Sequence, residues 1–362
     1  MEHRISLQHK GQIAALAAAF LFGCSAPLIS TLTGEGSALS IAALLYAGAT
    51  LGLLAARLLR RGPSQESPVR RTDLPALVAL TFLGGVVGPL ALVLGLGRLS
   101  PASGSLLLNL EAVFTLAIAV LVGREHLGKR GLLAVSLTMG GAVVVSGGSV
   151  SGASWQGSAL IAVATLAWGI DNNLSQRLSL RDPIQIALLK AAGASVPMLL
   201  VAFLLGERFP SPPQALAVLL IGVFGYGLSI WLDLLALREL GAAREAVIFS
   251  TAPFVGGLFS VVVLREPLTP ALVGAAVLMA GGVGLLLREN HGHWHQHERL
   301  LHDHRHCHDP IEEDPHHRHE HTPKQLEGFG TDGPYWHAHE HRHEETEHAH
   351  AHVSDAHHRH QH

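Results

Sequence analysis

Long apolar stretches separated by short polar connectors make up most of the first 290 residues. A helix needs about 20 apolar residues to cross the ~30 Å hydrocarbon core of a bilayer. The pattern therefore predicts an all-α integral membrane protein with ten transmembrane helices. We place these helices at residues 11–30, 37–57, 73–95, 101–122, 131–148, 155–175, 183–205, 213–237, 242–264 and 269–287.

Lysine and arginine are distributed unevenly over the predicted connectors. With the N-terminus inside, fourteen of these residues fall on the cytoplasmic side and three, Arg98, Arg208 and Arg265, fall outside. Because positive charge favours cytoplasmic loops, the sequence predicts that both termini are cytoplasmic and that the chain lies in a cell (inner or plasma) membrane.

The C-terminal segment 288–362 has a different character. Residues 291–362 hold 23 of the 26 histidines and carry a net charge of −8 with neutral histidines, against +5 for residues 1–290. The segment has few apolar side chains for a core, so we expect a disordered cytoplasmic tail. Imidazole is a ligand for Zn, Ni, Co and Cu, and the expected ligands are His291, His293, His295, His297, His302, His304, His306, Cys307, His308, His337, His339, His341 and His343.

The apolar body contains an internal repeat with an offset of 141 residues. Leu121–Leu127 aligns with Val262–Leu268, and Gly140-Gly141 aligns with Gly281-Gly282. The predicted units, 11–148 and 155–287, have five spans each. Because five is an odd number, the second unit is expected to be inverted, and carriers built from inverted repeats bind substrate near the midplane between the halves.

Short motifs recur in the same order in both units. An aromatic-Gly pair lies in the first helix (Phe22-Gly23, Trp168-Gly169), and a Glu-Ala-Val-Phe (111–114) or Ala-Pro-Phe (252–254) stretch lies in the fourth. Arg-Glu-x-Leu follows, and then a Gly-rich fifth helix. Over residues 11–287 the chain resembles the EamA-type transporters of the drug/metabolite transporter superfamily. The resemblance implies transport of a small metabolite; Ala112 departs from the proline common in that family.

Small residues four positions apart occur in two predicted spans. Ser136–Gly140 and Ala276–Ala280–Gly284 are spacings that let membrane helices approach closely, so we expect helix contacts there.

Glu111 is the foremost candidate for a functional polar group in the membrane. It lies ten residues into the fourth span, about 15 Å deep. A charge at this depth is expensive unless it is paired or hydrated. Glu111 could bind substrate or carry a coupling proton, or it could be a packing residue hydrogen-bonded to Asn109 or Ser105.

A second polar group lies toward the cytoplasmic ends of spans six to eight. Lys190 could pair with Asp171 or with Asp233, or it could extend to the interface while the aspartates meet headgroup water. The expected substrate-binding set is Glu111, Asn109, Trp168, Asp171, Asn172, Lys190, Trp231 and Asp233. Glu125 and Glu266, which recur in the repeat, are expected to be structural residues at helix ends.

Three functions remain open. The first is a secondary carrier that moves a small metabolite by alternating access. The second is a divalent transition-metal carrier with the tail as metal collector or sensor, although no predicted span contains histidine. The third is a membrane-tethered metal-binding protein that does not transport. The sequence has no phosphate-binding glycine loop, and we expect no enzyme activity, no required cofactor and no nucleic-acid partner.

Overall fold

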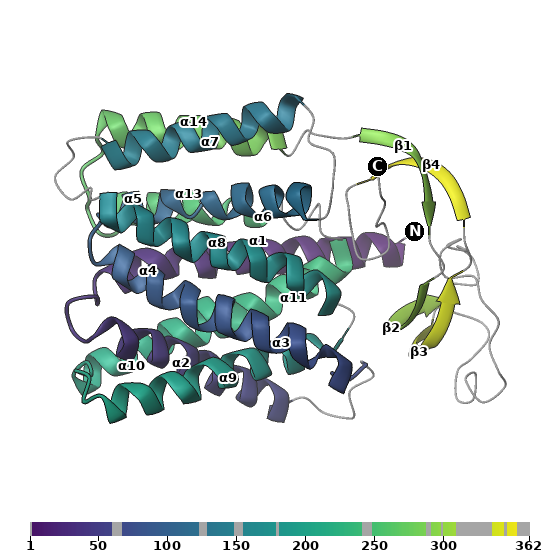
Figure 1. The fold of residues 1–362 in the computed structure, drawn as a ribbon, viewed down its shortest axis with the longest axis horizontal. Helices are drawn as coiled ribbons and strands as arrows, with labels where there is room; N and C mark the ends of the chain where they lie inside the picture. Colours follow the sequence, from purple (N-terminus) through teal and green to yellow (C-terminus); the bar gives the residue numbers. More distant parts are fainter. Residues whose placement is uncertain are drawn as a thin grey trace.

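The structure is a computed structural model of the full chain, with a helical body and a small β-region at one end of it (Figure 1). It describes residues 2–59, 67–122, 129–147, 155–178, 181–240, 248–286, 291–297, 300–308, 335–343 and 346–352.

The first half of the body contains the helices of the first repeat unit. They are α1 (Glu2–Ser30), α2 (Ala38–Leu59), η1 (Arg71–Asp73), α3 (Leu74–Leu80), η2 (Thr81–Val87), α4 (Gly88–Leu96), α5 (Pro101–Leu107), α6 (Leu110–Leu121) and α7 (Lys129–Gly147). The second half contains α8 (Trp155–Leu178), α9 (Pro183–Leu204), α10 (Pro212–Ile221), η3 (Gly222–Leu228), α11 (Ser229–Leu240), α13 (Ala252–Val262) and α14 (Pro270–Leu286).

Seven helical segments of the described residues are long and apolar enough to cross a membrane. Two shorter apolar helices, Ala252–Val262 and Pro270–Leu285, accompany them. α8 is long enough but is polar at both ends, with Gln156 near its start and Asp171–Asn173 near its end. Large apolar side chains such as Phe20, Phe82 and Phe203 are exposed on the outside of the body, as a lipid-facing surface requires. The chain is therefore an integral membrane protein, and the count of ten spans stays a prediction.

Two π-helical segments show the internal repeat in the backbone itself. η2 and η3 have seven residues each, and both ends of η3 lie 141 residues after those of η2. The start of α14 likewise lies 141 residues after the start of α7. π-helical turns are rare and often mark functional sites, so their recurrence at one place in each unit indicates a shared architectural role.

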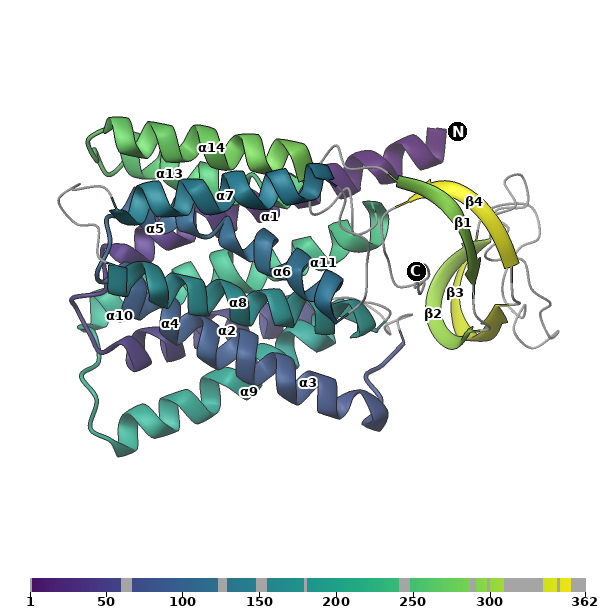
Figure 2. The same cartoon turned by 45° about the horizontal axis from the view of Figure 1, so that its top comes forward.

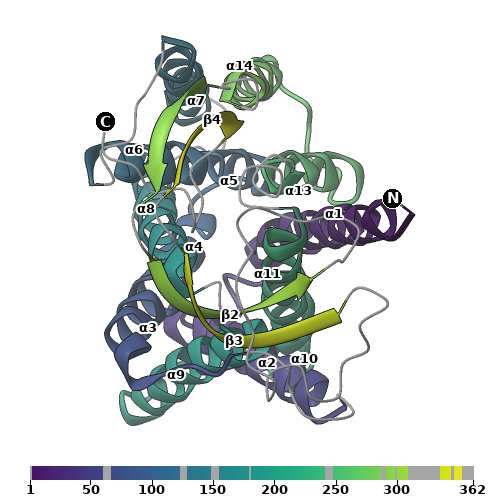
Figure 3. The ribbon, with the colours of Figure 1, turned by 90° about the vertical axis from the view of Figure 1, so that its right-hand side faces the viewer.

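The helices pack in a pattern that is symmetric when the two units are exchanged. α1 packs on α13 and α11, and α8 correspondingly packs on α6 and α4. The second helices, α2 and α9, pack on each other, as do the fifth helices, α7 and α14. Figure 3 shows α8 with α4 on one side of the body and α1 with α11 on the other. Each unit thus completes its packing against the other unit.

The aromatic-Gly motifs lie at two of these contacts. A Cβ atom on Gly169 in α8 would lie 3.0 Å from the Thr115 amide nitrogen of α6. A Cβ on Gly23 in α1 would overlap the Ala252 carbonyl of α13. The glycines are therefore needed for close approach of two backbones, the means by which membrane helices associate without a hydrophobic driving force.

The close contact between α7 and α14 does not use the small residues predicted for it, but neighbouring glycines on another face of each helix. Nothing described lies within 4 Å of a Cβ built on Gly140 or Gly284, and Ser136 is exposed. The α7–α14 contact uses Gly141 and Gly282 instead. A Cβ built on Gly141 would lie 3.0 Å from the Ala275 carbonyl oxygen, and one built on Gly282 would lie 2.7 Å from the Ala134 carbonyl oxygen. The prediction was wrong in position because four-residue spacing does not say which helix face meets a partner.

The described part of the tail contains four strands. They are β1 (His291–His297), β2 (Leu300–His308), β3 (Tyr335–His343) and β4 (Thr346–His352). β1 pairs with β4 and β2 with β3, both antiparallel. The alternation of histidine with other residues has the two-residue period of a strand, which the low content of apolar residues concealed. The strands and the N-terminus of α1 lie toward the same end of the body (Figure 2).

Candidate substrate site

A buried ion pair joins the first and second helices of the second unit. Lys190 of α9 donates to Asp171 Oδ2 of α8, and the two residues are 8% and 5% exposed. Burial of a charged pair is costly unless both partners are held by further contacts. The alternative that Lys190 extends to the membrane interface is therefore wrong. The other carboxylate oxygen, Asp171 Oδ1, is buried without a hydrogen-bond partner among the described residues.

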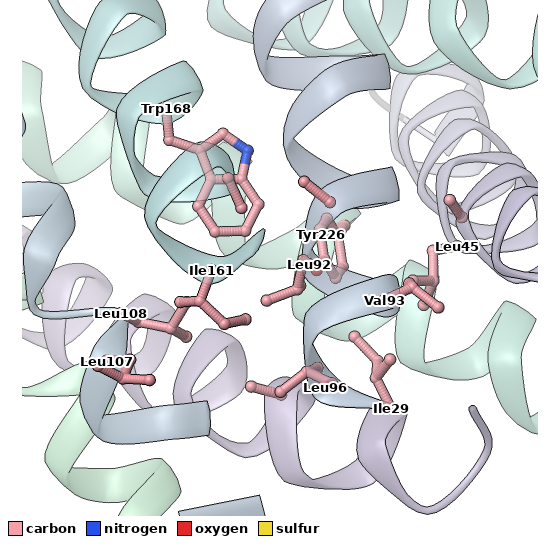
Figure 4. Packing of buried hydrophobic residues seen from close by; sticks show 14 of the residues in the cluster. Ile29, Leu45, Leu92, Val93, Leu96, Leu107, Leu108, Ile161, Trp168 and Tyr226 are labelled. Carbon is pink, nitrogen blue, oxygen red and sulfur yellow. The ribbon is translucent and has the colours of Figure 1, made fainter. Parts of the chain in front are cut away.

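The π-segment η2 supports this pair from the first unit. A Cβ on Gly84 would lie 2.5 Å from the Asp171 carboxyl carbon, so only glycine leaves room for the aspartate there. The Gly84 carbonyl accepts hydrogen bonds from Tyr46 Oη at 2.8 Å and from Trp168 Nε1 at 3.1 Å. Two side-chain donors on one carbonyl compensate for the disturbed hydrogen bonding of a π-helical turn within the membrane. Figure 4 shows Trp168 among the apolar side chains of the core.

Aromatic rings form a connected cluster beside the ion pair. Phe22 lies edge-on to Trp168 and to Tyr226, with ring centroids 5.9 and 6.0 Å apart. Tyr46 and Tyr226 follow at 5.6 Å. The cluster draws on α1, α2, α8 and η3, and it therefore lies where the two units meet. Such edge-to-face contacts stabilise packing by about 0.5–1.5 kcal/mol beyond burial.

Glu111 and Asn172 form a second polar contact between the units. Asn172 Nδ2 of α8 donates to Glu111 Oε1 of α6 at 2.8 Å, and Glu111 is half-buried. The neighbouring Asn173 donates to the backbone carbonyls of Thr115 and Gly169 at 3.2 and 2.8 Å. The expected partners of Glu111, Asn109 and Ser105, are not the ones it uses.

The remaining predicted residues divide between the site and the scaffold. Glu111 interacts electrostatically with Asp233 as well as with Asp171 and Lys190. Trp231 packs partly buried against the core. Asn109, in contrast, donates to the Leu106 carbonyl and to Met279 Sδ of α14. It therefore lies outside the polar group, because the backbone break between α5 and α6 turns it toward α14.

Glu266 has the structural role predicted for it. Its Oε2 atom accepts the backbone N–H of Ala102 at 2.7 Å, in the first turn of α5. Helix N-termini have unsatisfied N–H groups that a carboxylate satisfies. Its repeat partner Glu125 lies outside the described residues.

The predicted metal ligands all lie in three strands of the tail, β1, β2 and β3. Within the part of the chain whose side chains the structure describes, no group of three histidine, cysteine, aspartate or glutamate residues could hold a metal ion. The helical body shows no metal centre in those residues.

Of the aromatic cluster, sequence reasoning assigned only Trp168 to the site. Phe22 was noted only as a motif residue, and Tyr46 and Tyr226 were not singled out. The equivalence of Phe22 and Trp168 in the repeat was the available signal, since it places both on first helices that pack near the midline. Tyr46 and Tyr226 have no such signal, because their neighbours are distant in the sequence.

The fold agrees with the comparison with known proteins. The chain belongs to the EamA-like transporter family, which it matches twice, over residues 9–147 and 155–288. It is thus a membrane transporter, and the two matches correspond to the two repeat units.

Individual relatives support the class and leave the substrate open. The chain is 29% identical to an uncharacterized transporter of Methanothermobacter thermautotrophicus over 76% of this chain and 85% of that protein. It is 28% identical to a probable amino-acid metabolite efflux pump of Salmonella typhimurium over 58% of this chain and 80% of that protein. A solved protein crystal structure, 19% identical, matches with a TM-score of 0.56 over 76% of this chain and 95% of that one, and shows the fold alone.

Proposed function

We propose that the protein is a secondary carrier for a small organic metabolite that bears a positively charged amino group. The observation that carries the proposal is the charge balance where the units meet. Glu111, Asp171 and Asp233 are acidic residues whose charges lie near one another, and Lys190, which pairs with Asp171, is the one base that the described part of the chain places with them. A site with more carboxylates than cations in a low-dielectric region favours a bound cation or protons.

The contacts of Asp171 sharpen this inference. Lys190 uses one carboxylate oxygen, and the buried second oxygen has no donor among the described residues. A substrate ammonium group could donate to this oxygen, while the Phe22–Trp168–Tyr226 cluster offers ring faces for cation–π contact. The printed name of the Salmonella relative, an amino-acid metabolite efflux pump, is consistent with a substrate of this kind.

The proposed mechanism is alternating access between inverted repeat units. Ten spans with both termini cytoplasmic would follow from two five-span units of opposite orientation. The exchange-symmetric packing supports this arrangement. Reporter fusions after residue 290 should be active only with a reporter that works in the cytoplasm; activity limited to an exported reporter would contradict the orientation.

The charge requirement can be tested in proteoliposomes. We expect counterflow of an amino acid but little counterflow of its N-acetyl analogue, which lacks the positive charge. Glu111→Gln keeps the shape and hydrogen-bonding ability of the side chain and should remove the pH dependence of transport. Glu35→Gln, a change at an exposed carboxylate, is the matched control. Equal flux of both analogues, or an unchanged pH profile in Glu111→Gln, would overturn the proposal.

Divalent transition-metal transport is the second candidate, and the tail histidines favour it. It requires that truncation after residue 290 abolish Ni²⁺, Co²⁺, Zn²⁺ or Cu²⁺ flux. Retained amine flux without metal flux in the truncated protein assigns the body to the organic carrier. If neither flux occurs in the full chain, while metal binding persists, the protein is a membrane-tethered metal binder.

A further inference from the structure

The strand pairing in the tail places histidine opposite histidine. Six cross-strand pairs have histidine on both sides, and we call the two sets of three the histidine ladders. They are His291–His352, His293–His350 and His295–His348 between β1 and β4, and His302–His341, His304–His339 and His306–His337 between β2 and β3.

This register is selective. The positions between the histidines pair other residue types, such as Trp294 with Ala349 and Arg305 with Ala338. Directly opposed residues in an antiparallel pair share one face, and a slip of one residue would move a strand's histidines to the other face. The observed register therefore places the paired histidines of both strands on the same face of each two-stranded sheet.

The spacing suits metal coordination. Opposed residues have Cβ atoms about 4.5–5.5 Å apart, and alternate positions along a strand are separated by about 6.6 Å, from a rise of about 3.3 Å per residue. Two opposed imidazoles and one from the next position can converge on a single ion. Three histidines are an established ligand set for zinc.

Negative charge on the strands disfavours their pairing unless a cation offsets it. Asp303 lies opposite Glu340, and like charges in directly opposed positions destabilise a strand pair. Two-stranded sheets are only marginally stable by themselves, and the tail is net negative. A divalent cation held from both strands offsets this charge and cross-links the pair, so metal binding and strand pairing stabilise each other.

We propose that each histidine ladder is a transition-metal site, in which Zn²⁺, Ni²⁺, Co²⁺ or Cu²⁺ is held by histidines of both strands. The three opposed pairs form a row of ion positions. The proposal is independent of what the body transports.

Metal binding to the full chain in detergent tests which histidines matter. His302→Ala, His304→Ala and His306→Ala together remove one side of the β2–β3 ladder. The control replaces His316, His317 and His319, three tail histidines that lie outside the described residues. With Zn²⁺ alone at pH 7.5, the ladder variant should lose about half of the tightly bound ions, because one of two ladders is gone. The control should lose far fewer, and equal losses would overturn the proposal.

The register itself can be tested with the native Cys307, which pairs with Trp336. In Trp336→Cys, oxidation of the metal-free protein by diamide should form a 307–336 disulfide. Ala338→Cys places the new thiol opposite Arg305 and should cross-link much less. Equal cross-linking in both variants would refute the ladder register even if the tail binds metal.

Discussion

The two repeat units share a packing scaffold and differ in the chemistry placed on it. Gly84 of η2 packs against Asp171 of α8, and its counterpart Gly225 of η3 packs against Ser25 of α1. Asp171 and Ser25 are themselves equivalent, since each lies three residues after the aromatic residue of its first helix. The same contact thus carries a charged group in one half and a hydroxyl in the other.

Glu111 and Lys190, which lie in different units, likewise have no ionisable counterpart in the other unit. The repeat counterpart of Glu111 is Ala252. The helices α2 and α9 begin and end 145 residues apart, and aligning them makes Leu45 the counterpart of Lys190. Close backbone packing is duplicated because each unit must cross the other. The polar site is not duplicated, because each charge at membrane depth is costly and one set can serve both faces of a carrier.

Removing the charge of Asp171 should have the largest effect on stability. Asp171→Asn leaves Lys190 buried without its anionic partner, a change that costs about 3–5 kcal/mol in buried pairs. The counterpart change Ser25→Ala removes only a hydroxyl bonded to the Phe22 carbonyl and should cost far less. Unfolding in mixed SDS and detergent micelles measures both.

Removing the charge of Lys190 as well tests whether the stability lost in Asp171→Asn comes from the unpaired charge. The double variant Asp171→Asn, Lys190→Met should regain most of the stability, because no uncompensated charge remains. If the double variant is as unstable as Asp171→Asn, the loss comes from packing against Gly84 rather than from the charge.

The α7–α14 contact should give an intermediate effect that is the same in both units. Gly141→Ala and Gly282→Ala place a Cβ against the backbone of the facing helix, so we expect losses of about 1–3 kcal/mol from overpacking. Gly140→Ala and Gly284→Ala meet nothing described within 4 Å and should be neutral or gain up to about 1 kcal/mol from helix propensity. The same unfolding assay applies, and similar losses at Gly140 and Gly141 would contradict the described helix faces.

Tyr46→Phe should give the smallest effect. It removes one of two donors to the Gly84 carbonyl, while Trp168 continues to donate. We expect a loss of about 0.5–1.5 kcal/mol, the net value of one hydrogen bond. Thermal unfolding in detergent measures this loss, and a much larger destabilisation would mean that Trp168 does not compensate.

Much of the fold was predictable because the bilayer imposes a simple rule on the sequence. A long apolar run becomes a helix, since every backbone polar group must be satisfied within the membrane. The repeat was visible for a similar reason: Gly141 and Gly282 recur because two backbones approach closely at each. The predicted contacts of Gly140 and Gly284 were wrong, because the choice of helix face depends on the partner helix.

The sequence by itself determined that this chain is a membrane protein with two related units and that its tail is rich in histidine, and it singled out Glu111, Asp171 and Lys190 as candidate polar groups. Only the tertiary structure decided that Lys190 pairs with Asp171, that Glu111 contacts Asn172 and that Phe22, Tyr46, Trp168 and Tyr226 form one cluster. The reason is physical. Burial and helix formation follow from local composition, whereas the partner of a polar group depends on how helices far apart in the chain cross.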